Sequence, residues 1–105
     1  MKMYSIKVTP DAKVDLRKYL SYINNKLKNP QAAKNVADDF IKTKDSLKNL
    51  AGSLAEPDSE KLKDRGLKRI SFMNHDYFLL YRVKGNRVEI TNMFHGSEDY
   101  ESKLR

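Results

Sequence analysis

The apolar residues of this chain change their spacing part-way along, and this change limits the folds that the chain can adopt. From about residue 12 to residue 50 they recur at helical spacing, and from residue 67 onward they gather in short runs of β-branched and aromatic residues. The pairs Thr9-Pro10 and Asn29-Pro30 each combine a capping side chain with a proline at the first helical position. We therefore expect two helices, the second ending near Gly52, that pair as a hairpin across a short turn.

The remaining apolar pattern predicts strands. Alternation over residues 4–8 indicates a short first strand. Residues 67–72, 77–83 and 87–94 are three β-rich runs separated by short polar segments, which is typical of an antiparallel meander. The middle run carries apolar residues on both of its faces, so it should occupy a central position in the sheet.

The order of these segments predicts an α+β fold in one domain, residues 1–105. It consists of an N-terminal strand, a helical hairpin, a three-stranded antiparallel meander forming one sheet with helices on one face, and a short C-terminal helix over residues 97–104. The other face of the sheet should be partly open. Residues 53–66 show no sustained period and contain Pro57, so we expect a connecting loop there.

The composition excludes several classes of function. Cysteine is absent, which removes disulfides, thiolate zinc sites and thiol nucleophiles. No run is long and apolar enough to cross a bilayer, and the first residues lack the apolar core of a secretory signal. We also find no phosphate loop, no zinc spacing and no nucleophilic triad. The expected protein is cytoplasmic, with no membrane contact, metal or cofactor.

The chain is basic, with a net charge of +7, which favours an approach to nucleic acid or to an acidic protein segment. The candidate residues for binding a target or nucleic acid lie around the meander: Lys61, Lys63, Arg65, Arg69 and Arg82. Arg69 is the best single candidate, because a charge in a strand beside an open face needs a partner. The alternative is a solvated surface, partly neutralised by Asp58, Glu60 and Asp64.

Three motifs in the second half of the chain carry a family resemblance. They are Gly66-Leu67-Lys68-Arg69-Ile70, Tyr77 with Tyr81-Arg82-Val83, and Phe94-His95-Gly96 followed by Asp99-Tyr100-Glu101. Together they resemble the RelE/ParE superfamily of plasmid-stabilisation toxins from bacterial type II toxin-antitoxin pairs, and they are closer to the ParE branch. The resemblance implies a growth-inhibiting toxin that a cognate acidic antitoxin neutralises.

The ribonuclease branch of this superfamily implies one mechanism, ribosome-dependent cleavage of messenger RNA. His95 and Tyr100 would then be the candidate acid/base pair, with Lys61, Lys63, Arg69 and Arg82 as the candidate cations for the phosphate. Phe78 and Glu98, however, stand where that branch often has arginines. The structural alternative for His95 is a hydrogen-bonded residue before the turn at Gly96, and for Tyr100 a ring that anchors the last helix.

The ParE branch implies a different mechanism, inhibition of a target such as DNA gyrase by binding rather than by catalysis. Such chains often carry basic residues where this one has Ser97 and Glu98, so gyrase and ribosome-bound messenger RNA both stay open as targets. A third hypothesis is a non-toxic or decayed interaction module. The apolar hairpin is compatible with a homodimer and with a toxin-antitoxin hetero-oligomer.

Overall fold

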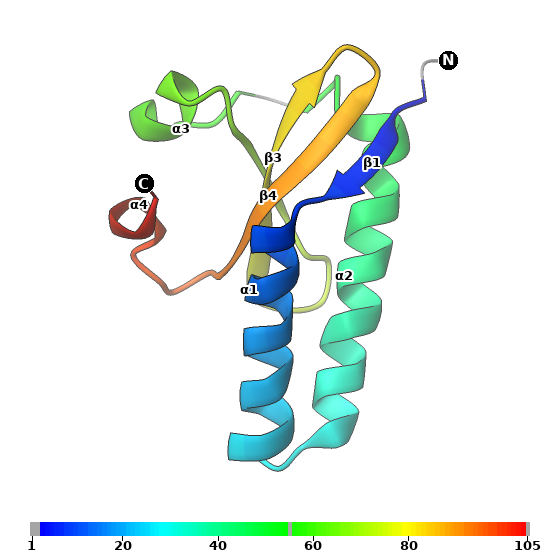
Figure 1. Cartoon of the computed structure of the whole chain (residues 1–105), viewed down its shortest axis with the longest axis vertical. Coiled ribbons are helices and arrows are strands. Elements are labelled where there is room, and N and C mark those ends of the chain that lie inside the picture. The colour runs from blue at the N-terminus through cyan, green and yellow to red at the C-terminus, as the bar shows by residue number, and fades with distance from the viewer. Residues whose placement is uncertain (1–2, 55, 105) are drawn as a thin grey trace.

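A computed structural model describes residues 3–54 and 56–104 of the chain (Figure 1). Along the sequence the elements are β1 (Ser5–Val8), α1 (Pro10–Ser21), a π-helical turn (Tyr22–Lys26), α2 (Pro30–Leu50), α3 (Glu60–Asp64), β2 (Lys68–Ser71), β3 (Tyr77–Lys84), β4 (Arg87–His95) and α4 (Tyr100–Lys103). The predicted α+β order is confirmed, including the helical hairpin, the meander and the short C-terminal helix.

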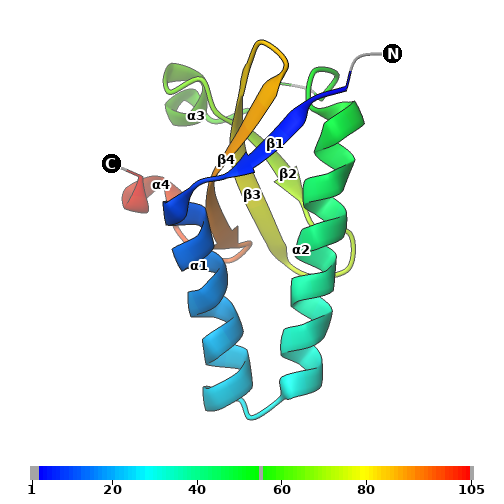
Figure 2. The same cartoon turned by 45° about the vertical axis from the view of Figure 1, so that its right-hand side comes forward.

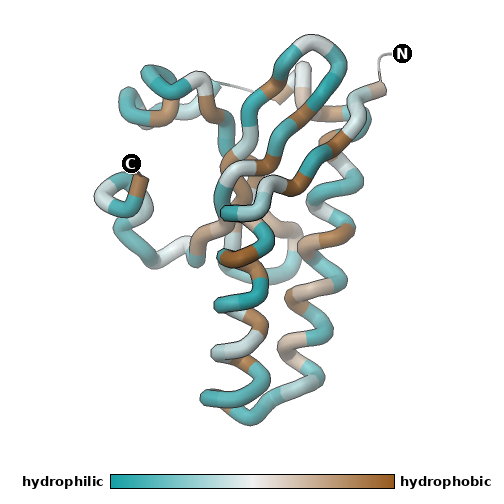
Figure 3. Tube along the Cα trace, viewed as in Figure 1, coloured by the Kyte–Doolittle hydropathy of each residue, from teal (hydrophilic) through white to brown (hydrophobic). Residues whose placement is uncertain are grey.

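Both long helices begin where the sequence predicts. The Thr9 side chain accepts a hydrogen bond from the Ala12 amide at 3.3 Å, and the Asn29 side chain accepts one from the Ala32 amide at 3.1 Å. Each cap is followed by proline, whose fixed φ suits the first turn of a helix. Apolar residues recur between polar ones along both helices (Figure 3), as expected when each helix buries one face against the rest of the protein.

The sheet has four strands in the order β1-β4-β3-β2. The meander β2-β3-β4 is antiparallel, with β3 in the predicted central position. β1 lies beside β4 and parallel to it, with Ser5 opposite Arg87 and Val8 opposite Ile90. The sheet therefore joins the start of the chain to its last strand. The hairpin of α1 and α2 covers one face of this sheet (Figure 2).

Alternate residues of β3 point into two separate cores. Leu79 and Tyr81 face the hairpin and pack in a cluster that also holds Val36, Phe40 and Leu47 of α2. Phe78 and Leu80 face the other way, into a smaller cluster whose other buried members are Leu62, Leu67 and Phe94. Apolar side chains on both faces of the central strand are thus buried, as the sequence predicted.

One expectation was wrong in detail, because the predicted loop over residues 53–66 contains the short helix α3. The Ser59 hydroxyl caps it by accepting from the Leu62 amide at 3.3 Å, and Leu62 itself is 0% exposed. A five-residue helix with one buried apolar side chain has no period that a sequence pattern could show. Side chains from α3 and the C-terminal tail cover part of the face that was expected to be partly open.

Among the described residues, the helices are all too short or too polar to cross a membrane.

Candidate functional site

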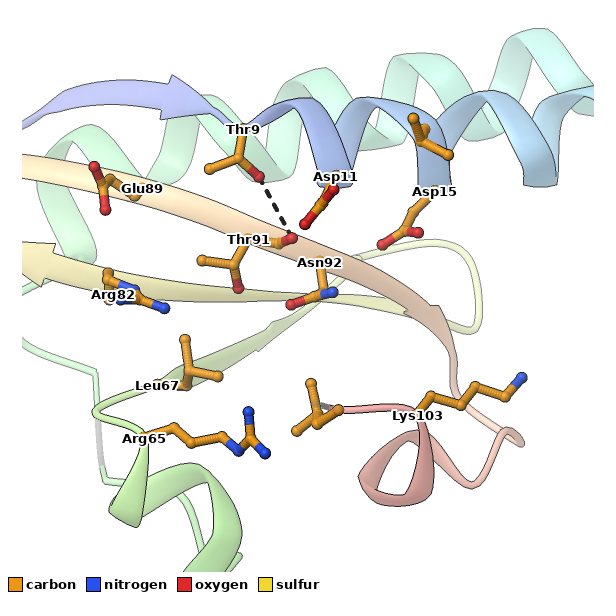
Figure 4. A pocket seen from close by; sticks show the side chains of 12 residues that line it. Thr9, Asp11, Asp15, Arg65, Leu67, Arg82, Glu89, Thr91, Asn92 and Lys103 are labelled. Atoms are coloured by element: carbon orange, nitrogen blue, oxygen red, sulfur yellow. Dashed lines mark hydrogen bonds between the residues drawn. The ribbon is translucent and has the colours of Figure 1, made fainter.

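A cleft of about 880 Å³ lies between the N-terminal end of α1 and the face of the sheet that carries Arg82 and Glu89 (Figure 4). Its walls come from the N-terminal end of α1, from β3 and β4, from the residues after α3 and from the C-terminal tail. The polar residues that shape it include Thr9, Asp15, Arg65, Arg82, Glu89 and Lys103. Hydrogen bonds across this junction, such as that from the Thr9 hydroxyl to the Ile90 carbonyl at 2.9 Å, hold α1 against β4.

Arg82 lies on the sheet side of this cleft, directly across from Glu89 in the pairing of β3 with β4. Both lie on the face opposite the hairpin, since the neighbouring Tyr81 and Val83 pack in the hairpin core. Glu89 is engaged by Arg87 at 3.3 Å and by Lys84 at 3.7 Å. The Nε of Arg82 is buried and has no hydrogen-bond partner within the described part of the chain.

The two sides of the cleft differ in charge. Figure 4 shows Asp11 and Asp15 on α1 along one side and Arg65 and Lys103 on the other. Asp15 also has a structural role, because its Oδ2 accepts a hydrogen bond from the Met93 amide at 3.0 Å. Burial raises the pKa of this carboxyl, against the opposing effect of that hydrogen bond and of Lys18.

The predicted cationic residues do not form one patch. Arg65 and Arg82 line the cleft, where Lys103 joins them, a residue that charge patterns near the meander did not single out. The guanidinium of Arg69 instead lies 3.8 Å from the centre of the Phe78 ring, a cation-π contact that covers the smaller core. The remaining two are at the surface: Lys61 donates to the Glu101 carbonyl, and Lys63 lies 3.7 Å from Glu60.

His95 and Tyr100 lie on opposite faces of the sheet. The His95 ring meets Tyr77 edge-on at 5.1 Å between centres, and Tyr77 packs against the hairpin core. The Ser97 hydroxyl lies 2.7 Å from the His95 Nδ1. Tyr100 contacts Phe78 at 5.1 Å and Phe94 at 5.9 Å, both in the smaller core. The fold therefore does not bring this candidate acid/base pair to one place.

Glu98 turns inward instead of facing a ligand. Its carboxylate accepts hydrogen bonds from the Tyr19 hydroxyl, from the His95 amide at 2.9 Å and from the Lys103 ammonium. Burial alone would raise its pKa, but these donors prevail and lower the pKa of Glu98 to about 2. Burial and the same contact raise the pKa of the Tyr19 hydroxyl. The sequence did not reveal this role, because the Tyr19 hydroxyl comes from α1, 79 residues earlier in the chain, even though His95 and Lys103 are near Glu98 in sequence.

A second polar site was also absent from the sequence predictions. Asp39 of α2 is 2% exposed, and its Oδ2 accepts hydrogen bonds from the His75 Nδ1 at 2.7 Å and from the Asn74 amide at 3.0 Å. These donors lower the pKa of Asp39 even though burial opposes them. The arrangement fastens the β2–β3 connection to α2 beside a hollow of about 310 Å³.

Comparison with known proteins assigns this chain to a family. Residues 6–100 match the model of a family described as the ParE toxin of the type II toxin-antitoxin system, parDE. The chain belongs to the ParE toxin family. The ParE branch of the RelE/ParE superfamily, indicated by the three motifs in the second half of the sequence, is thereby confirmed.

Two solved structures share the fold of this ParE-family chain. One, from the chromosomal ParDE toxin-antitoxin system of P. aeruginosa, has a TM-score of 0.74 and 24% identity over 89% of this chain and 96% of its own. The other, from the toxin-antitoxin complex RelBE2 of Mycobacterium tuberculosis, has a TM-score of 0.59 and 22% identity over 93% of this chain and 97% of its own. No curated protein gives a significant match.

Proposed function

We propose that this ParE-family chain arrests growth in the cytoplasm by binding a macromolecular target, with DNA gyrase the expected one, and not by cleaving RNA. The observation that carries this proposal is the separation of His95 from Tyr100 by the thickness of the sheet. General acid/base cleavage at a phosphate needs both groups within hydrogen-bond reach of the same reacting atoms. Two groups on opposite faces cannot act on one phosphate.

The positions that differ from the ribonuclease branch support the same proposal. Phe78 is 1% exposed and belongs to the smaller core, so it supplies no charge to a phosphate. The carboxylate of Glu98 already accepts hydrogen bonds within the fold, one of them from Lys103. The proposed target-binding cations are Lys61, Lys63, Arg65, Arg69 and Arg82, of which Arg65 and Arg82 line the cleft.

We further propose that an acidic antitoxin neutralises the chain. The net charge of +7 favours such a partner through long-range attraction. The two similar solved structures come from a ParDE system and a RelBE2 complex, which supports a partner of this class.

The test is inducible expression, with and without the neighbouring antitoxin gene, followed by two assays. Purified protein should inhibit supercoiling by gyrase, while primer extension on transcripts from arrested cells should show no new ends within codons. New codon-internal ends with unaffected supercoiling would overturn the proposal in favour of a ribonuclease. Unchanged growth on induction would overturn both the binding mechanism and the ribonuclease mechanism, and would favour the non-toxic interaction module.

A further inference from the structure

The guanidinium of Arg82 has hydrogen-bonding capacity that the described residues do not fill, because its Nε has no acceptor among them. An arginine side chain stays protonated at any pH that proteins tolerate and offers five donors in a fixed fork. The acceptor that faces it across the strands, Glu89, already binds Arg87 and Lys84. A buried donor left without an acceptor is costly, and the Nε of Arg82 is such a donor. The rest of the Arg82 side chain is partly exposed and lines the cleft, so an acceptor that binds there can engage the guanidinium.

The space beside Arg82 is large enough for such an acceptor. The cleft of about 880 Å³ falls within the range of about 300–1,000 Å³ usual for ligand sites. Its lining is mixed in charge and not mainly apolar, unlike most sites for small molecules. A concave, polar site suits an extended peptide segment better than the convex surface of a large globular target.

The charge pattern distinguishes a peptide from a nucleic acid. Asp11 and Asp15 form one side of the cleft, and Glu89 lies beside Arg82. A continuous row of phosphates would pass close to these carboxylates and be repelled. A peptide can place a single carboxylate at Arg82 and neutral or basic groups along α1.

We infer that Arg82 receives a carboxylate side chain from an extended acidic segment of the antitoxin, docked in the cleft between α1 and the C-terminal tail. This inference rests on the proposed antitoxin partner and specifies where that partner binds. The bond is a charge-assisted, bidentate pair of the kind that arginine forms with Asp or Glu. Arg65 on the opposite side adds attraction for the acidic segment, whereas the neighbouring Lys103 is already paired with Glu98.

The experiment is calorimetric titration of the chain with the purified product of the adjacent antitoxin gene. Arg82→Met should weaken binding by at least about ten-fold, the loss expected for a hydrogen bond to a charged group. Arg82→Lys keeps the charge without the fork and should lose less. Arg17→Met is the matched control: it removes the same charge from an exposed site on α1 outside the cleft and should change the affinity by less than about two-fold.

The antitoxin side gives a second test that does not depend on the stability of the Arg82 variants. Each acidic residue of the antitoxin is changed to its amide and titrated against the wild-type chain. One change should weaken binding by about ten-fold, and it should be non-additive with Arg82→Met in a double-mutant cycle.

The outcomes separate this inference from the function on which it rests. If the wild-type chain fails to bind the antitoxin, both are overturned. If the wild type binds and Arg82→Met, shown to be folded by its thermal melt, binds equally well, only this inference is overturned. The same holds if no antitoxin carboxylate couples to Arg82, or if Arg82→Met loses affinity for a single-stranded RNA probe but not for the antitoxin.

Discussion

The hydroxyl of Tyr19 donates a hydrogen bond to the carboxylate of Glu98, joining the last turn of α1 to the segment after β4. The same carboxylate accepts from the His95 amide and from Lys103. A residue that in sequence resembled a misplaced negative charge near a binding site is thus an internal fastening between the hairpin and the C-terminal tail.

Glu98→Gln should destabilise the chain by about 1–3 kcal/mol, because the partly buried Tyr19 hydroxyl and His95 amide lose a charged acceptor. Tyr19→Phe should also destabilise it, and the double variant should show a coupling of about 0.5–3 kcal/mol. Urea unfolding measures all three free energies. Glu60→Gln is the control, since that side chain is 83% exposed and its loss should change stability by less than about 0.5 kcal/mol. Strict additivity of the two changes would contradict the assigned contact.

Stability should fall in acid because of the same residue. The pKa of Glu98 is lowered from 4.5 to about 2 in the folded chain, so between these values the unfolded chain binds a proton that the folded chain does not. The stabilisation is fully present above the unfolded pKa and is lost as the pH falls toward the folded one. Asp39, whose pKa is also lowered, acts in the same direction. Urea midpoints measured from about pH 6 to about pH 3 should decline less steeply for Glu98→Gln than for the wild type. Parallel curves would show that the carboxyl titrates alike in both states.

Asp39→Asn should cost about 1–3 kcal/mol, because it removes the charged acceptor of His75 and of the Asn74 amide. The neighbouring Asp38 is exposed, so Asp38→Asn is a matched control that should leave the unfolding free energy almost unchanged. Amide hydrogen exchange should also show faster opening of the β2–β3 connection in Asp39→Asn. Equal effects of the two changes would contradict the buried link.

Leu62→Ala should destabilise the chain by about 2–5 kcal/mol, since Leu62 is fully buried in the smaller core. Exchange of the α3 amides should increase more than that of the α2 amides. Lys63→Ala, next to it and exposed, is the comparison. If both variants unfold at the same denaturant concentration, α3 does not pack against the sheet as described.

Tyr100→Phe should leave growth arrest unchanged under the proposed binding mechanism, because the ring keeps its contacts with Phe78 and Phe94 and loses only its hydroxyl. Colony counts after induction measure the effect. Loss of toxicity in a variant that melts at the wild-type temperature would assign a chemical role to the hydroxyl and favour RNA cleavage.

Much of the fold could be predicted because its signals are local. The caps at Thr9 and Asn29 and the alternation along β3 are read from neighbouring residues, and the structure confirms each of them. The helix α3 was not predicted, since five residues show no helical period and its one buried side chain, Leu62, contacts the smaller core only in the folded chain.

The candidate site was predictable to a smaller extent. Basic composition pointed to Arg65 and Arg82, both of which line the cleft. It also pointed to Arg69, whose guanidinium makes a cation-π contact with the Phe78 ring. Whether a charge faces solvent, a ring or a carboxylate depends on residues far away in sequence, as the pairing of Glu98 with Tyr19 demonstrates.

The parallel pairing of β1 with β4 has a consequence for synthesis of the protein in the cell. β1 is made early, yet its partner residues begin at Arg87, so the nascent hairpin has no finished sheet to cover until most of the chain has emerged from the ribosome. A fragment released before that point holds an unpaired first strand and an uncovered apolar hairpin face. Any activity that depends on the completed sheet therefore arises late in translation, and interrupted synthesis should yield harmless products.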